Sequence, residues 1–282
     1  MRKYLYLMRF NRPLPILLIV WSTLWALFDA ASGYPNLNYV IIFVLGSFLM
    51  RTAGCIFNDI ADRKYDKLVK RTENRPITSG QISVKTAIIL ALIIVIICFF
   101  IVLMLNLLTI LLSFVAMALA LSYPLFKRFF AMPQLILGMA FNFGVLMAYT
   151  AVQNTIPATA WLLYIGAIFW TIAYDTMYAL ADLPDDQKLG LFSSARTFGA
   201  KTFMAIALLQ LFMLLSLGLL GFIKDYNWCF YATLAISVAL FIQQAKDYRK
   251  KTITDCIRAF SDNHWVGLLI FIGIVFQYLP LS

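Results

Sequence analysis

Long apolar stretches alternate with short polar segments along nearly the whole chain. Runs of about 20 apolar residues have the length that an α-helix needs to cross a bilayer. They predict nine transmembrane helices, over residues 13–32, 37–57, 83–104, 107–125, 132–153, 157–178, 202–223, 227–245 and 263–281. The predicted fold is therefore all-α, and residues 1–282 are expected to form a single integral membrane domain.

Composition supports a membrane protein and narrows the possible functions. Hydrophobic residues make up 62% of the chain and charged residues only 13%, against roughly 25% charged residues in soluble domains. The net charge of +10 does not indicate nucleic-acid binding, because no basic and aromatic module lies outside the predicted helices. The four cysteines form no CxxC pair, and a single histidine excludes a haem held by two histidines.

Basic residues also predict how the chain is oriented, since cytoplasmic loops of membrane proteins collect Lys and Arg. With the N-terminus in the cytoplasm, Lys224 is the one basic residue of 23 that falls on the opposite side. We therefore expect a multi-pass membrane protein whose N-terminus and longer polar loops are cytoplasmic. Anionic lipid headgroups account for the positive charge.

Two acidic clusters stand at the ends of predicted helices. In the first, Asp59, Asp62 and Asp66 are spaced i, i+3 and i+7, so a helix places them within about 60° of one another. In the second, Asp182 and Asp186 are spaced i, i+4. The predicted topology puts both clusters on the cytoplasmic side, where they can face each other across one cavity.

Carboxylates beside a bilayer cost energy to desolvate, so this arrangement requires a reason. Mg²⁺ binds carboxylate oxygens together with substrate phosphates. The two clusters therefore predict an enzyme that holds a diphosphate through Mg²⁺. A polar loop of this kind is often merely solvated, but here the same-face spacing occurs twice on one side. Basic residues would complete such a site, and the candidates are Arg63, Arg71, Arg75, Lys127, Arg128, Lys188 and Arg196.

Several longer stretches resemble the UbiA superfamily of membrane aromatic prenyltransferases, and most closely its bacterial 4-hydroxybenzoate polyprenyltransferases of ubiquinone synthesis. The matching stretches are Met8 to Pro13, Asn58 to Asp66, Lys70 to Pro76, Tyr123 to Arg128 with Pro133-Gln134, and Tyr174 to Gly190. The resemblance implies nine helices around a central cavity with a cytoplasmic cap. It also implies the reaction: a polyprenyl diphosphate ionises, and the carbon ortho to the hydroxyl of 4-hydroxybenzoate attacks.

The resemblance assigns roles to particular positions. Asn58 with Asp59, Asp62 and Asp66 matches the first Mg²⁺ and diphosphate motif, and Asp182 with Asp186 matches the second. Residues that match diphosphate or cavity positions are Arg9, Arg71, Arg75, Tyr123 and Lys127. One departure is Leu183-Pro184 between the outer acids, where relatives usually carry polar residues. Proline lacks a backbone donor, so a slightly different turn is expected there.

Aromatic and acceptor residues are less clearly indicated. A carbocation requires a dry cavity with aromatic faces, and the rings expected to line it are Phe141, Phe143, Tyr149, Tyr174 and Tyr178. Asp175 lies 20° from Asp182 on the helical wheel and is expected in the polar wall. The benzoate carboxylate calls for a guanidinium, for which spacing does not rank Arg9, Arg63, Arg128 and Arg196.

Alternatives remain at this stage. The same chemistry could act on a naphthoate, homogentisate, haem or a chlorophyll precursor. A cation-coupled transporter is a remote alternative, because transporters usually place acids near the bilayer midplane on broken helices. A lipid phosphotransferase is a further alternative, but the Asp-Gly-x-x-Ala-Arg run usual for that class is absent from this sequence. A long isoprenoid tail further predicts a lateral opening from the cavity to the bilayer.

Overall fold

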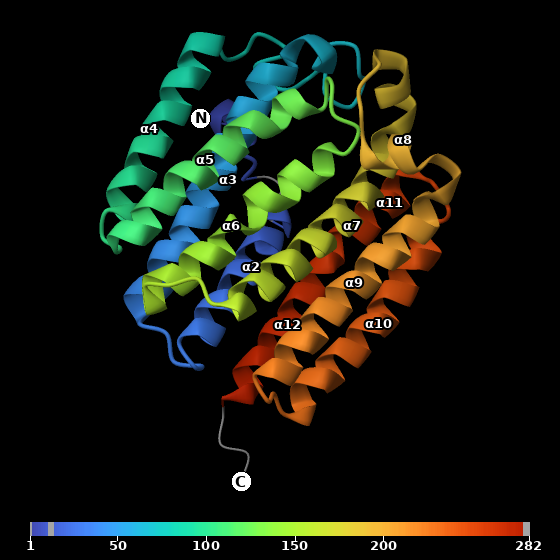
Figure 1. Ribbon diagram of the computed structural model, residues 1–282. Helices are drawn as coiled ribbons and strands as arrows, with labels where there is room; N and C mark the ends of the chain where they lie inside the picture. The colour runs from blue at the N-terminus through green and yellow to red at the C-terminus, as the bar shows by residue number, and fades with distance from the viewer. Residues whose placement is uncertain (1, 11–13, 279–282) are drawn as a thin grey trace.

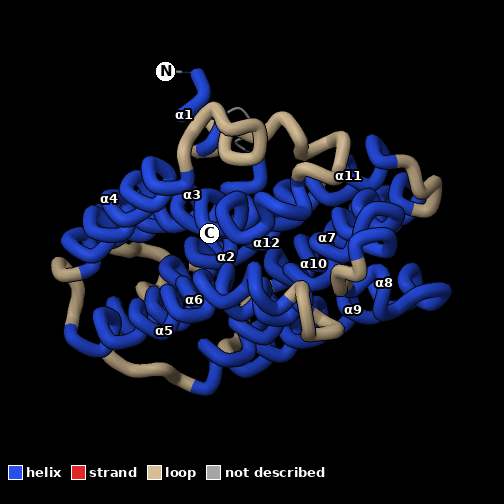
Figure 2. Tube along the Cα trace, turned by 90° about the horizontal axis from the view of Figure 1, so that it is seen from above, coloured by secondary structure: helices blue, strands red, loops and turns tan. Residues whose placement is uncertain are grey.

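The structure of the protein is a computed structural model that describes residues 2–10 and 14–278. Within these ranges every regular element is helical (Figures 1 and 2). The helices are α1 (Arg2–Leu7), α2 (Leu14–Ala30), α3 (Leu37–Asp66), α4 (Val84–Val102), α5 (Leu107–Phe126), α6 (Pro133–Gln153), α7 (Ala158–Leu189), α8 (Ser194–Phe198), a 3₁₀ turn η1 (Gly199–Lys201), α9 (Thr202–Ile223), α10 (Trp228–Tyr248), α11 (Ile253–Ser261) and α12 (Asn263–Gln277).

Polar residues beside the apolar runs set where several helices begin. The side chains of Asn36, Ser83, Asn106 and Asn227 each accept a hydrogen bond from a backbone N–H in the first turn of α3, α4, α5 and α10 respectively. Such caps satisfy backbone donors that have no partner within the helix. At its other end α7 stops at Gly190, whose φ of 72° suits glycine.

The helices form one bundle in which α2 and α7 are central. Helix α2 packs against α3, α6 and α12, while α7 packs against α6, α9 and α11. Helices α4 and α5 lie on one flank and α9 and α10 on the other (Figures 1 and 2). The main core is built around α2, α6 and α7, and a second buried cluster lies between α3 and α4.

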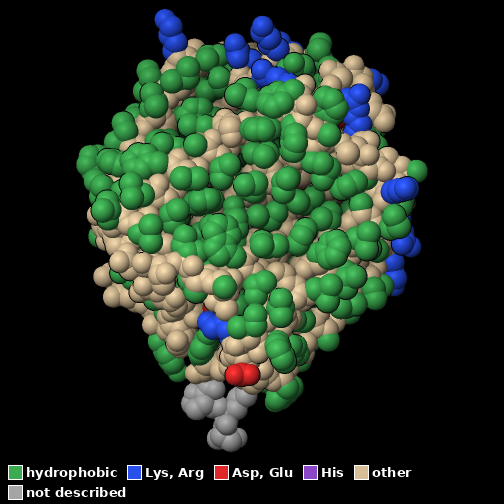
Figure 3. Space-filling model, viewed as in Figure 1, with side chains coloured by type: hydrophobic (Ala, Val, Ile, Leu, Met, Phe, Trp, Pro, Cys, Tyr) green, Lys and Arg blue, Asp and Glu red, His purple; other side chains and the backbone are tan. Residues whose placement is uncertain are grey.

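Apolar side chains cover much of the outer surface. Phe100 is 65% exposed and Leu215 58%, and hydrophobic side chains dominate the face shown in Figure 3, with Lys and Arg gathered at its upper and right edges. This surface suits contact with lipid tails rather than water. Among the described residues, seven helical stretches are long and apolar enough to cross a membrane.

All nine predicted transmembrane segments overlap a helix, although fewer meet the criteria for a span. Helix α2 has only 17 residues, and α7 is not among the seven. The all-helical membrane fold is confirmed. Nine transmembrane helices were predicted, and seven helical stretches of the described residues are long and apolar enough to cross a membrane. Pro184 lies inside α7, which continues to Leu189, so the helix does not end at this proline.

Helices α3 and α7 are the longest of the described helices, with 30 and 32 residues. Their C-terminal turns extend to the same end of the bundle and carry Asp59 to Asp66 and Asp182 to Asp186. We call this end the motif end and the opposite end the distal end. The extra turns place both acidic clusters at the mouth of one cavity.

Candidate active site

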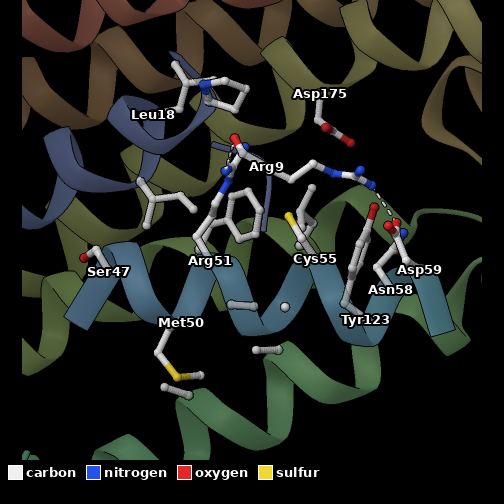
Figure 4. A pocket seen from close by; sticks show the side chains of 18 of the residues that line it. Arg9, Leu18, Ser47, Met50, Arg51, Cys55, Asn58, Asp59, Tyr123 and Asp175 are labelled. Carbon is white, nitrogen blue, oxygen red and sulfur yellow. Dashed lines mark hydrogen bonds and ion pairs between the residues drawn. The ribbon is translucent and has the colours of Figure 1, made fainter. Parts of the chain in front are cut away.

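A single cavity of about 710 Å³ lies between α2, α3, α4, α5, α6 and α7. At the motif end its wall is polar and includes both acidic clusters, whereas deeper in the bundle it is lined by side chains such as Ile42, Val102 and Met117. Figure 4 shows the α3 side of this cavity, where Arg9, Asn58, Asp59, Tyr123 and Asp175 face a common space. The two clusters therefore do oppose each other across one cavity.

The first cluster is tied together by two arginines. The side chain of Asp59 is fully buried, and its Oδ1 accepts from Arg9 Nη2 at 2.6 Å and from Arg75 Nη1 at 3.1 Å. Arg75 Nη1 also donates to Asp66 Oδ2 at 2.8 Å. Because α3 runs unbroken through Asp66, the carboxylates share one helix face, and Arg75 from the following segment closes over two of them.

The second cluster is bound to the same segment through Arg71. Its guanidinium donates to Asp182 Oδ1 and, at 2.6 Å, to the hydroxyl of Tyr178, and it lies 5.3 Å from the centre of the Tyr178 ring. Arg71 and Arg75 lie one helical turn apart in sequence yet reach different clusters. The segment after α3 thus joins both acidic clusters and covers the cavity mouth.

Lys127 completes the polar wall from the end of α5. Its ammonium lies 3.7 Å from Asp62 Oδ2 and 5.2 Å from the centre of the Tyr123 ring. Asp175, Asp185 and Asp186 line the same cavity. Among the residues that the structure describes there, each acidic cluster has a basic partner within reach of its carboxylates.

The surrounding charges keep these basic residues protonated. Burial by itself lowers the pKa of the Arg75 guanidinium, but the carboxylates of Asp59 and Asp66 outweigh it and raise the pKa above its ordinary value. Burial also opposes the charge on Lys127, while Tyr123 and neighbouring carboxylates raise the pKa of its ammonium. The site therefore holds positive charge where a diphosphate would enter.

Two oxygens at the mouth fit a hard cation. Asn58 Oδ1 and Asp59 Oδ2 are buried without a hydrogen-bond partner, and a buried acceptor left in this way costs about 1–3 kcal/mol. The described residues contain no group of three His, Cys, Asp or Glu side chains placed to hold a metal ion. This donor set suits Mg²⁺, which commonly takes a few protein oxygens and completes its coordination with water and substrate phosphate.

Arg51 is a cavity residue that the sequence analysis missed. It lies on α3 within the cavity wall, beside Ser47, Met50 and Cys55 (Figure 4). A signal was present in the sequence, because a residue seven positions before Asn58 falls about 20° from it on a helical wheel. Arg51 escaped notice because a basic residue inside an apolar span was read as part of the span.

Some predicted residues lie elsewhere. The guanidinium of Arg63 donates to Ile60 O, that of Arg128 to Ala61 O, and that of Arg196 to Leu191 O. None of these three side chains lines the described cavity, and neither does Lys188. The guanidinium groups of Arg63 and Arg128 are held by carbonyls of α3, and that of Arg196 by a carbonyl in the segment after α7, which keeps all three away from the cavity.

Two predicted aromatic residues are corrected as well. Phe143 is buried in the core, where it packs edge-to-face with Tyr164 at 6.0 Å. Tyr149 lies towards the distal end and donates to Asp29 Oδ2. Phe141, Tyr174 and Tyr178 do line the cavity. Residues Asn11 to Pro13 of the N-terminal stretch lie outside the described residues.

Comparison with known proteins gives a consistent result. Residues 19–274 match the model of the UbiA prenyltransferase family. The chain is 54% identical over 279 residues to a 4-hydroxybenzoate octaprenyltransferase of Francisella tularensis subsp. mediasiatica, covering 99% of this chain and 98% of the relative. It is 46% identical over 276 residues to one of Psychromonas ingrahamii, covering 98% and 96% respectively.

Solved structures show the same fold. The apo structure of a UbiA homolog from Aeropyrum pernix K1 superposes with a TM-score of 0.79 at 25% identity and covers 93% of this chain and 98% of its own. A UbiA homolog from Archaeoglobus fulgidus, bound to GPP and Mg²⁺, superposes with a TM-score of 0.72 at 15% identity, covering 97% of this chain and 99% of its own.

Proposed function

Because the chain belongs to the UbiA prenyltransferase family, we propose that its cavity binds a polyprenyl diphosphate and transfers the polyprenyl group to 4-hydroxybenzoate. The protein is a membrane prenyltransferase. The new bond joins the prenyl C1 to the ring carbon ortho to the hydroxyl, the bond from C1 to the diphosphate oxygen breaks, and that ring carbon loses its proton. The observation that carries this proposal is the pair of acidic clusters facing each other across one cavity, joined by Arg71 and Arg75.

We assign the diphosphate to the motif end. Arg71 and Arg75 from the segment after α3 and Lys127 from the end of α5 supply positive charge at the mouth, and guanidinium groups bind phosphate oxygens through paired hydrogen bonds. Asn58 and Asp59, with the carboxylates of Asp62, Asp66, Asp182 and Asp186, would hold Mg²⁺ beside it. When bound there, Mg²⁺ neutralises negative charge on the departing diphosphate.

The rest of the cavity protects the allylic cation that forms as the C1–oxygen bond breaks. Tyr123, Phe141 and Tyr174 line the cavity and can present aromatic faces to a cation. The apolar wall excludes water, which would otherwise capture the cation. The charge on the departing diphosphate is stabilised by groups that are already in place, and this lowers the barrier to ionisation.

Arg51 is the residue that we assign to the acceptor. It lies seven residues before Asn58 on α3, so about 10 Å separates the two positions along the helix axis. This spacing leaves room for one benzoate ring between the guanidinium and the diphosphate site. A two-pronged pair with Arg51 would then hold the carboxylate and turn the opposite, hydroxyl-bearing edge of the ring towards C1.

The donor and the location follow from the relatives. Octaprenyl diphosphate is the donor we propose, because the two relatives compared above are named octaprenyltransferases, and their acceptor places the reaction in ubiquinone biosynthesis. The basic residues at the motif end favour the cytoplasmic side of the inner membrane for that end.

The direct test uses membranes that contain this chain, a labelled octaprenyl diphosphate and each aromatic acceptor in turn. Prenylated 4-hydroxybenzoate should form in the presence of Mg²⁺, while membranes with the Asp182→Ala variant should form none. Arg51→Leu should raise the KM for 4-hydroxybenzoate more than the KM for the donor. Preferential use of a naphthoate or homogentisate by the wild type would overturn the assigned acceptor.

A further inference from the structure

One short helix, to which the sequence analysis assigned no role, contributes a side chain to the cavity wall. Helix α11 lies at the motif end beside α7 (Figure 1), and Phe260 in its last turn lines the cavity. Among the described residues that follow Ser193 in the chain, Phe260 is the one that does so. It also lies outside the stretches that carry the family resemblance.

The sequence of α11 explains how it is held against α7. Cys256, Ala259 and Phe260 share one helix face and are all buried. The first turn is capped by the side chain of the threonine that precedes it. At the other end Asn263, the first residue of α12, donates to Ala259 O at 2.8 Å and accepts from Trp170 Nε1 of α7 at 3.0 Å. Helix α11 is therefore docked on α7 through its buried face and through Asn263.

Phe260 packs against two tyrosines that lie one turn apart on α7. Its ring meets that of Tyr174 edge-to-face with centres 5.7 Å apart, and that of Tyr178 with centres 5.1 Å apart. Tyr174 in turn packs on Trp170 at 5.2 Å, and Trp170 packs on Trp25 of α2 at 5.0 Å. A column of rings thus runs from the core of the bundle to the cavity mouth, and Phe260 connects Tyr174 to Tyr178 within it.

The column ends at a guanidinium of the polar mouth. The hydroxyl of Tyr178 accepts from Arg71 at 2.6 Å, and the centre of its ring lies 5.3 Å from the guanidinium. The same guanidinium donates to Asp182. Arg71 lies in an irregular segment, so no helix fixes the direction of its long side chain, which has many rotamers. Tyr178 and Asp182 together therefore determine where this positive charge lies.

Tyr178 depends in turn on support from the α11 side. It lines the cavity and is only half-buried, so part of its ring borders open space. An edge-to-face pair fixes the relative orientation of two rings as well as burying their area. An aliphatic side chain at position 260 would fill the same space, but it would leave the Tyr178 ring free to turn towards the cavity.

We propose that Phe260 is a positioning residue for the donor: it holds the Tyr178 ring, and Tyr178 holds the Arg71 guanidinium beside Asp182, where the diphosphate enters. This inference rests on the proposed function and adds α11 to the parts of the protein that serve it. Phe260 carries no polar group, so it acts on the diphosphate only through Tyr178 and Arg71. The acceptor is not affected by this chain of contacts, because Arg51 lies on α3.

The test separates the two substrates in one variant. Phe260→Leu keeps an apolar side chain but loses the ring, and it should raise KM for octaprenyl diphosphate about fivefold, the scale of one aromatic pair. KM for 4-hydroxybenzoate and kcat should stay within about twofold of wild type, because the acceptor site and the metal site are unchanged. Phe260→Tyr keeps the ring and should recover most of the affinity for the donor.

A double-mutant cycle shows whether the effect passes through Arg71. In an Arg71→Lys background the planar guanidinium is already lost, so adding Phe260→Leu should raise KM for the donor by less than about twofold more. Independent effects would multiply instead.

A matched control removes a ring of the same kind elsewhere. Phe230 is fully buried, packs edge-to-face with Tyr226 at 4.8 Å and does not line the cavity. Phe230→Leu should lower the unfolding temperature without changing KM for either substrate. Thermal unfolding of each variant shows that it is folded, and Phe260→Met, which nearly conserves volume, takes the place of Phe260→Leu if that variant unfolds.

Three results would overturn the proposal: an unchanged KM for the donor in the folded Phe260 variant, an equal rise in KM for both substrates, or full multiplication of the effects of Phe260→Leu and Arg71→Lys. Absence of prenylated product from every sample, wild type included, would instead reject the proposed function.

Discussion

Buried aspartates lie at both ends of the bundle, and their carboxylate oxygens differ in how fully they are hydrogen-bonded. At the distal end Asp29 of α2 is 1% exposed, and both of its carboxylate oxygens are satisfied. Oδ1 accepts from Lys224 Nζ at 2.6 Å, from the hydroxyl of Tyr278 at 2.8 Å and from that of Tyr226, while Oδ2 accepts from Tyr149. At the motif end Asp59 has one oxygen bound to two arginines and the other without a partner.

The difference separates a structural carboxylate from one prepared for a ligand. Asp29 joins α2 to α6, to the connection between α9 and α10, and to the residue after α12, and it does not line the cavity. Its fully bonded state contributes to holding the distal ends of these helices together. Asp59 lines the cavity and keeps an oxygen free, which is costly unless something binds there.

The same substitution at the two positions should therefore produce different phenotypes, with the largest effect at the motif end. Asp59→Asn removes the charge that a divalent cation requires, and we expect kcat to fall by about 10³-fold, the scale of losing a central electrostatic contact. The unfolding temperature should fall as well, because Arg9 loses its buried carboxylate partner, although Arg75 keeps Asp66. Rates of product formation and thermal unfolding in detergent measure the two effects.

At the distal end Asp29→Asn should lower stability while leaving activity nearly unchanged. Lys224 would keep its charge while losing its buried carboxylate partner, and breaking such a pair costs about 3–5 kcal/mol. Lys224 is 24% exposed, so we expect the lower part of that range. The unfolding midpoint should drop, whereas kcat at a temperature where the variant is folded should stay within about twofold of wild type. A large loss of kcat in the folded variant would show that the distal cluster takes part in the reaction.

Arg75 offers a smaller test of the motif end. Arg75→Lys keeps the charge but cannot bridge Asp59 and Asp66 with a planar guanidinium. We expect KM for the polyprenyl diphosphate to rise about tenfold, the scale of one charge-assisted hydrogen bond, with a smaller change in kcat. An Arg249→Lys variant, at a basic residue at the end of α10 that does not line the cavity, serves as the matched control.

The smallest expected effect is that of one hydroxyl at the distal end. Tyr149→Phe removes a single donor to Asp29 Oδ2 and should lower the free energy of unfolding by about 1–3 kcal/mol without altering KM for either substrate. Changes in substrate affinity would contradict the position of Tyr149 outside the cavity.

Sequence patterns were sufficient for the motif end because its signals are local. The spacing of Asp59, Asp62 and Asp66 already places them on one helix face, and α3 does continue through Asp66. The location of both clusters at one end followed from the number of helices between them. These inferences need only helical periodicity and the length of a bilayer span.

Helical periodicity could not predict the cluster around Asp29, nor which carboxylates Arg71 and Arg75 contact. Asp29, Tyr149 and Lys224 come from segments far apart in the chain, and nothing local links them. Arg71 and Arg75 lie in an irregular segment, so no periodicity indicates that one reaches Asp182 and the other Asp59. Tyr149 was expected in the cavity because its helix flanks the site, but its position on that helix turns it towards Asp29.

The central claim is that the two acidic clusters bind a divalent cation together with the donor diphosphate. It is tested most directly by measuring how tightly the purified protein binds a non-reactive thio analogue of a prenyl diphosphate, with Mg²⁺ present and after exhaustive chelation. Wild type and Asp29→Asn should bind the analogue at least tenfold more tightly with Mg²⁺, and Asp59→Asn should show no such dependence. Equal binding by wild type with and without divalent ions would contradict the claim.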